Sequence, residues 1–106
     1  LEIDLPSPGM VRLAGRELAL APLGWDLLAA LADTPGRVLT REALCARLWP
    51  EEEAAPQPQQ LDAHRRRLTQ RLAPAFRQKR GELIQVVRGI GLRLNLAETE
   101  IALRRG

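Results

Sequence analysis

The chain of 106 residues has no tyrosine, one phenylalanine, one cysteine and one histidine. A single cysteine and a single histidine cannot form a disulfide or a four-ligand zinc site, so we expect no metal and no cofactor. Cys45 and His64 could formally make a catalytic pair, but Cys45 lies in a stretch rich in alanine and leucine (residues 43–48), where a small buried thiol is ordinary. Nothing else indicates an active site, and we expect that the protein is not an enzyme.

Long hydrophobic runs are also missing. No apolar run approaches the roughly 18 residues that cross a membrane, and the chain does not open with a signal sequence. We therefore expect a cytoplasmic segment without membrane contact. The hydrophobic share of 45% and the charged share of 27% are ordinary for a globular fold, and 106 residues suit a single domain. Because residue 1 is leucine rather than methionine, we expect the segment to belong to a longer protein.

The two halves of the chain differ in charge, because the first half has few basic residues and the second half has few acidic ones. Residues 1–58 contain five arginines against nine acidic residues, whereas residues 59–106 contain eleven basic against four acidic residues. A one-sided basic half is typical of a protein with a polyanionic partner. The alternative is a solvated charged face in an arginine-rich protein, since fifteen of the sixteen basic residues are arginine.

The N-terminal part of the chain alternates apolar and polar residues. This pattern in residues 1–5, 10–13 and 17–20 predicts a small antiparallel sheet with one exposed face. Pro22 suits the first turn of a helix, whose leucines fall on one side and which the turn at 33–36 ends. Thr40 is a good N-cap for a second helix over residues 41–48.

The third predicted helix, from about residue 58 or 59 to Leu72, has two different faces. At about 100° per residue, Leu61, Leu68 and Leu72 lie within about 40° of one another and form the core side. The opposite side carries Gln59, Ala63, Arg66, Arg67 and Gln70. A helix of this kind fits the major groove of DNA, where arginine and glutamine can bind guanine and adenine edges.

A β-hairpin is predicted after the third helix. Residues 82–87 and 92–96 read as two strands, joined by the turn 88–91, in which two glycines are available for positive φ. Arg88 in this turn suits insertion into a minor groove, although arginine is also common in solvated turns. The tail 97–106 predicts either a short helix or no regular structure.

Three stretches stand out together: Thr34–Trp49 (TPGRVLTREALCARLW), Leu61–Leu68 (LDAHRRRL) and Ile84–Leu94 (IQVVRGIGLRL). In order and spacing they resemble the winged-helix DNA-binding domain of the OmpR/PhoB type, the C-terminal output domain of bacterial response regulators. The last stretch is similar to the family's wing signature, Val-Arg-Gly-x-Gly-Tyr-Arg.

The resemblance implies one α+β domain over residues 1–106 with a winged helix-turn-helix. Its parts are an N-terminal antiparallel sheet (1–20), a three-helix core (22–73), a hairpin wing (82–96) and a tail (97–106). The implied function is sequence-specific binding of double-stranded DNA, with the recognition helix (about 59–72) in the major groove and the wing (84–94) at the minor groove.

The resemblance also implies site residues and partners. The matching positions are Ala63 (apolar base contact), His64 (phosphate), Arg66 and Arg67 (phosphate and base), Arg88 (minor groove or its phosphates) and Trp49 (an indole N–H donor to phosphate, or a core residue). The one-sided charge adds Arg71 and Arg77 as further sources of phosphate attraction. Family members contact RNA polymerase through the loop that matches residues 50–59, for which a passive connector is the alternative. They usually bind direct repeats as tandem homodimers.

Several positions depart from the family pattern. Ala21 and Pro22 replace the usual threonine cap of the first helix, so we expect its start to lack a side-chain cap. Arg65 falls on the apolar stripe of the third helix, where it must reach water or find a partner such as Asp62 or Glu82. Val86 and Leu92 replace a threonine and a tyrosine that donate to phosphate. These losses keep an alternative open, a winged-helix module that acts in protein interaction or as a regulatory appendage without DNA binding.

Overall fold

The structure of the chain is a computed structural model that describes residues 1–6, 9–13, 15–50, 58–73 and 83–104. Along the chain, the elements within these residues are β1 (Glu2–Asp4), β2 (Met10–Leu13), β3 (Arg16–Ala19), α1 (Pro22–Ala32), β4 (Leu39–Thr40), α2 (Arg41–Leu48), α3 (Pro58–Leu72), β5 (Ile84–Val87), β6 (Gly91–Leu94), the 3-10 helix η1 (Glu98–Glu100) and β7 (Ala102–Arg104). The predicted α+β class, the helices and the hairpin are confirmed. No helix in these stretches is long and apolar enough to span a membrane.

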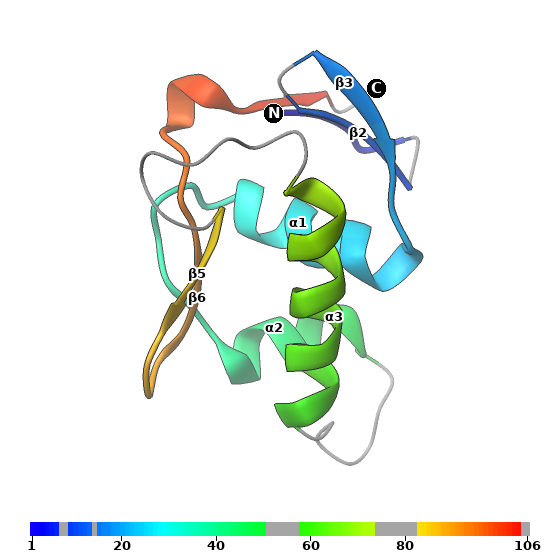
Figure 1. The fold of residues 1–106 in the computed structure, drawn as a ribbon. Helices are drawn as coiled ribbons and strands as arrows, with labels where there is room; N and C mark the ends of the chain where they lie inside the picture. The colour runs from blue at the N-terminus through cyan, green and yellow to red at the C-terminus, as the bar shows by residue number, and fades with distance from the viewer. Residues whose placement is uncertain (7–8, 14, 51–57, 74–82, 105–106) are drawn as a thin grey trace.

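The first sheet lies at the end of the molecule where both termini are found (Figure 1). Its strand order is β3-β2-β1-β7, and β1, β2 and β3 pair antiparallel as their alternation predicts. Four apolar residues that alternate along these strands, Ile3, Val11, Leu13 and Leu18, are buried, whereas Met10 is exposed. The sheet therefore has the one covered face that the sequence pattern requires.

The fourth strand of this sheet, β7, was not predicted. It pairs parallel to β1, and the backbone N–H of Ala102 donates to the Leu1 carbonyl at 2.8 Å. Ile101 and Leu103, which flank an exposed Ala102, are half-buried against the core. The sequence predicts a short helix or no regular structure in this tail, and only η1 agrees with that prediction. The strand was missed because it forms by pairing with β1, which comes from the opposite end of the chain.

The second sheet has the order β4-β6-β5 and contains the predicted hairpin. The observed strands are shorter than predicted, residues 84–87 and 91–94, and residue 82 lies outside the described part of the chain. Of the two turn glycines, Gly89 has a φ of 74°, and Gly91 instead begins β6. A Cβ added at Gly91 would lie 1.9 Å from the carbonyl oxygen of Leu39. Gly91 is thus required by the close approach of β4, a strand that was not predicted.

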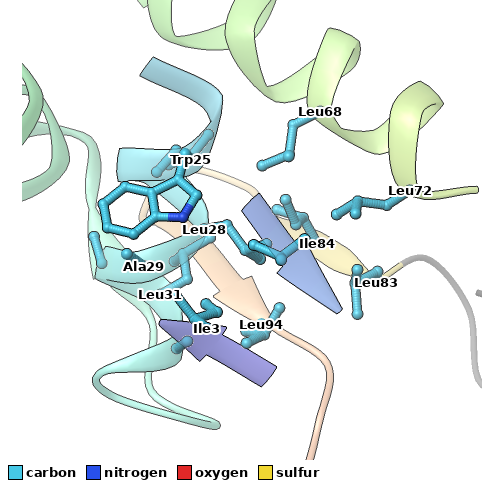
Figure 2. Close-up of a cluster of buried hydrophobic side chains, with 14 of the residues drawn as sticks. Ile3, Trp25, Leu28, Ala29, Leu31, Leu68, Leu72, Leu83, Ile84 and Leu94 are labelled. Carbon is cyan, nitrogen blue, oxygen red and sulfur yellow. The ribbon is translucent and has the colours of Figure 1, made fainter. Parts of the chain in front are cut away.

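The three helices pack around a leucine core. In α1, Leu27, Leu28 and Leu31 are fully buried. Figure 2 shows Leu68 and Leu72 of α3 pointing from the third helix toward the buried side chains of α1 and of the strands. Thr40 caps α2 as predicted, since its Oγ1 accepts a hydrogen bond from the N–H of Ala43 at 3.1 Å. The start of α1 has no side-chain cap, which is also as predicted.

Replacement of Gly91 by alanine is expected to destabilise the protein by about 3 kcal/mol or more, because the new methyl group collides with the backbone of Leu39 and must push β4 away from β6. The control is Gly24→Ala in α1, where a Cβ would lie 3.8 Å from Leu68 Cδ1, an ordinary contact. Removing glycine from a helix there should stabilise the fold by about 0.5–1 kcal/mol. Urea denaturation of both variants checks this, and similar values for the two would contradict the role of Gly91.

Candidate nucleic-acid interface

The packing of α3 determines which of its side chains face outward. Leu61, Leu68 and Leu72 are each at most 3% exposed, as the leucine stripe predicts. With this side against the core, the side chains of Arg66 and Arg67 on the opposite side of the helix are exposed. Ala63, on the same outer side, and His64, next to the stripe, are half-buried. The outer surface of α3 therefore presents guanidinium donors to solvent.

The hairpin tip carries another predicted site residue, Arg88. Arg88 is exposed in the turn, where the N–H of Ile90 donates to the Val87 carbonyl at 3.0 Å. Ile90 beside it is 54% exposed, more than the other large apolar side chains of the described residues. Figure 1 shows the hairpin reaching toward the end of the molecule that holds α2 and the N-terminal part of α3, away from the first sheet. The tip and the start of α3 thus share one end of the molecule.

Trp49 lies where α2 ends, and its packing fits the core role, one of the two weighed for it. The indole is half-buried and packs against the hydrophobic core. Its ring centroid lies 5.8 Å from that of His64 in α3, with an angle of 49° between the rings. Trp49 and His64 therefore form a contact between α2 and α3. Donation from the indole N–H to a phosphate stays a prediction.

Arg71 has a structural contact that the sequence did not reveal. Its Nε donates to the backbone carbonyl of Ala19 at 3.0 Å, which joins the C-terminal part of α3 to the end of β3. The acceptor is a backbone atom, so no residue type in the sequence could have indicated it. The side chain is nevertheless exposed. Its terminal nitrogens do not take part in this bond and can still attract an anion.

Arg65 finds one of the two partners considered for it. Its side chain is only 13% exposed, and its Nε lies 3.5 Å from Oδ1 of Asp62. Asp62 also lies 3.9 Å from a guanidinium nitrogen of Arg41, at the start of α2. One carboxylate therefore compensates the arginine on the apolar stripe and connects α2 with α3. Glu82, the other candidate, lies outside the described residues.

Cys45 has the surroundings of a structural thiol. The side chain is half-buried in α2 and packs against the core. Burial raises the pKa of the Cys45 thiol, and the positive charge of Arg41 opposes this effect in part. A raised pKa leaves less thiolate at neutral pH, which makes Cys45 a poorer nucleophile than a free cysteine. Across the described stretches, no group of three His, Cys, Asp or Glu residues is placed to hold a metal ion.

Some predicted contacts fall outside the described residues. They are most of the loop proposed for RNA polymerase (residues 51–57) and Arg77. The interface can be built without them from α3, from Trp49 and from the hairpin tip.

Three helices followed by a β-hairpin at the edge of the helical core define a winged helix. The chain belongs to the family described as "Transcriptional regulatory protein, C terminal", whose model matches residues 15–94. This match covers β3 to β6 and leaves β1, β2 and β7 outside it.

Similar proteins are response regulators and related transcription factors. The chain is 34% identical over 94 residues to the transcriptional regulatory protein CseB of Streptomyces coelicolor, which covers 88% of this chain and 37% of CseB. It is 43% identical over 49 residues to the DNA-binding response regulator MtrA of Mycobacterium tuberculosis, or 46% of this chain and 21% of MtrA. The chain thus spans well under half the length of these relatives.

Among solved structures, the DNA-binding domain of Klebsiella pneumoniae RstA in complex with the RstA box is similar. Its TM-score is 0.64 at 25% identity, and the match covers 80% of this chain and 81% of the RstA domain.

The pairing of Arg65 with Asp62 generates a stability prediction. Asp62→Asn should destabilise the protein by about 1–2 kcal/mol, because it leaves the largely covered Arg65 guanidinium without its carboxylate. The exposure of both side chains keeps the effect below that of a fully buried pair. Arg65→Ile, which completes the apolar stripe, should be neutral or stabilising, and the double variant should be more stable than Asp62→Asn alone. Denaturant titration of the three variants measures this. Additive effects would show that the two residues do not interact.

Proposed function

We propose that this chain binds double-stranded DNA as the output domain of a transcriptional regulator, with α3 in the major groove and the β5–β6 hairpin at the minor groove. One observation carries the proposal: the leucine stripe of α3 packs inward and leaves Arg66 and Arg67 exposed on the opposite side. Membership of a family of transcriptional regulators supports it. So does the fold shared with an RstA domain that was solved on its DNA box.

Some of the proposed contacts recognise the DNA bases, and the others bind the phosphate backbone of the DNA. Arg67 and Arg66 reach base edges, where arginine binds guanine in a bidentate manner, and the small Ala63 lets the helix approach the bases. Attraction to the phosphates and the minor groove comes from His64, Arg71, Arg88 and the Trp49 indole N–H. The exposed side chains among these are long and flexible, as backbone contacts on a duplex require.

Further proposals rest on the resemblance alone. Residues 50–59 would contact RNA polymerase, and two copies would bind direct repeats in tandem. A domain of this function would act in the cytoplasm, where the bacterial chromosome is found. No catalytic step belongs to this function, in keeping with a family of transcriptional regulators.

A second candidate function, a protein-interaction module that has lost DNA binding, is favoured by one feature of the hairpin. Leu92 takes the place of the family's tyrosine and is buried, and Val86 is exposed but has no hydroxyl group. The hairpin therefore lacks two phosphate donors. The salt dependence of binding separates the two candidates.

The affinity for a DNA duplex should fall steeply with salt. Four to six phosphate contacts predict a slope of roughly −4 to −5 when the logarithm of the association constant is plotted against that of the salt concentration. Fluorescence anisotropy with a labelled duplex at several salt concentrations measures the slope. A slope near zero would reject the proposal and favour the interaction module.

The two proposed surfaces should respond differently to mutation. Arg67→Ala should weaken binding to a preferred site by about 1–3 kcal/mol and reduce the preference for that site, whereas Arg88→Ala should weaken binding to all duplexes to a similar degree. Arg12→Ala is the control, because it removes the same charge from an exposed arginine of β2 in the first sheet. Competition between specific and random duplexes measures both effects. An equal loss from Arg12→Ala would show that net charge alone drives binding.

A further inference from the structure

A hollow of about 320 Å³ lies between the β3–α1 junction and α3, and we refer to it as the α1–α3 groove. Its apolar lining comes from Leu20, Leu23 and Leu68. His64, Arg67 and Arg71 line it from α3 with polar groups. These three residues are spaced i, i+3 and i+7, so they follow one side of the helix along the length of the groove.

The groove is complementary to an anion. Its ionisable lining consists of one histidine and two arginines, and no carboxylate is among the described residues that line it. The bond from Arg71 Nε to the Ala19 carbonyl fixes one guanidinium beside the groove. An arginine binds a carboxylate through two parallel N–H···O bonds, and Arg67 and Arg71 are the two guanidinium groups that line the groove.

A glycine inside α1 keeps the groove open. Gly24 lines the groove although glycine is unfavourable inside a helix. A Cβ at this position would lie 3.8 Å from Leu68 Cδ1, so no tight packing between the helices excludes a side chain. A longer side chain at residue 24 would extend into the hollow. The absence of a side chain at residue 24 therefore leaves space in the groove and is not required by close packing of α1 on α3.

We propose that the α1–α3 groove binds a small amphipathic carboxylate, with its hydrocarbon on the leucines and its carboxylate on the arginines. The volume is at the lower end of the range for small-molecule sites and suits a medium-chain carboxylate. The apolar lining selects this class over a nucleic-acid phosphate, because a phosphate group gains nothing from leucine side chains, whereas a hydrocarbon chain is stabilised by leaving water.

Occupancy of the groove would also regulate DNA binding, a consequence that rests on the proposed function. His64, Arg67 and Arg71 belong both to the groove and to the proposed DNA interface. A carboxylate held by Arg67 neutralises a side chain that must reach the major groove. The ligand and the duplex therefore exclude one another, and each lowers the apparent affinity of the other by the same factor.

Octanoate is the probe for binding, with acetate and octanol as matched controls that lack the hydrocarbon and the charge respectively. A titration of the ¹⁵N-labelled chain, followed by two-dimensional NMR, should give saturable shifts of the amide signals of Leu23, Gly24 and Leu68. Both controls should bind at least about tenfold more weakly. Shifts that do not saturate, that fall elsewhere, or that octanol reproduces would overturn the proposal.

Gly24→Leu tests the site without altering the proposed DNA contacts. It should abolish the octanoate shifts and leave duplex affinity within about twofold of the wild type, because no DNA-facing side chain changes. Circular dichroism monitors its folding, and Leu20→Gln, which makes the lining polar, gives a second test that does not require a larger side chain. Octanoate binding that persists in both variants would contradict the groove as the site.

The competition experiment separates the site from the proposed function. At an octanoate concentration about tenfold above its Kd, duplex affinity should fall about tenfold in the wild type and not in Gly24→Leu, with acetate at equal ionic strength as control. Octanoate binding without any duplex binding would overturn the proposed function and leave the site. Duplex binding that octanoate does not weaken would overturn the regulatory role.

Discussion

The packing of one side of α3 against α1 is the constraint on which the rest of the structure depends. Leu61, Leu68 and Leu72 are buried together, and this fixes the rotation of the helix about its own axis. Because the helix has 3.6 residues per turn, the same rotation determines that Arg66 and Arg67 face solvent. Burial of the leucine stripe therefore both stabilises the fold and orients the polar side of α3. No separate interaction is needed to keep Arg66 and Arg67 facing solvent.

The two sheets extend this arrangement in opposite directions. The first sheet pairs β1 with β7, the first and last strands of the chain, at the end of the molecule away from the hairpin tip (Figure 1). The second sheet carries the hairpin, and the contact of Gly91 with the backbone of Leu39 holds it against the start of α2. The position of the hairpin tip relative to the helices thus depends on a residue that has no side chain.

Local sequence patterns predicted the elements that are stabilised by interactions between residues close together in the sequence. The leucine period predicted α3, the threonine at residue 40 predicted the cap of α2, and alternation predicted the first three strands. Elements that depend on distant partners were missed: β4 is two residues long and needs β6, and β7 needs β1 from the other end of the chain. The α1–α3 groove was missed for the same reason, since it depends on where two helices cross. The Asp62 partner of Arg65 was found because it lies one turn away.

The account is tested most directly by NMR titration of the labelled chain with a short DNA duplex, which maps where DNA binds on the surface and does not require an identified target sequence. The amide signals that shift should lie on the outer side of α3, around residues 63–67, and at the hairpin tip around Arg88, while the first sheet stays unchanged. Shifts centred on the first sheet, or on only one of the two predicted surfaces, would contradict the claim that the helix and the hairpin form one DNA-binding interface.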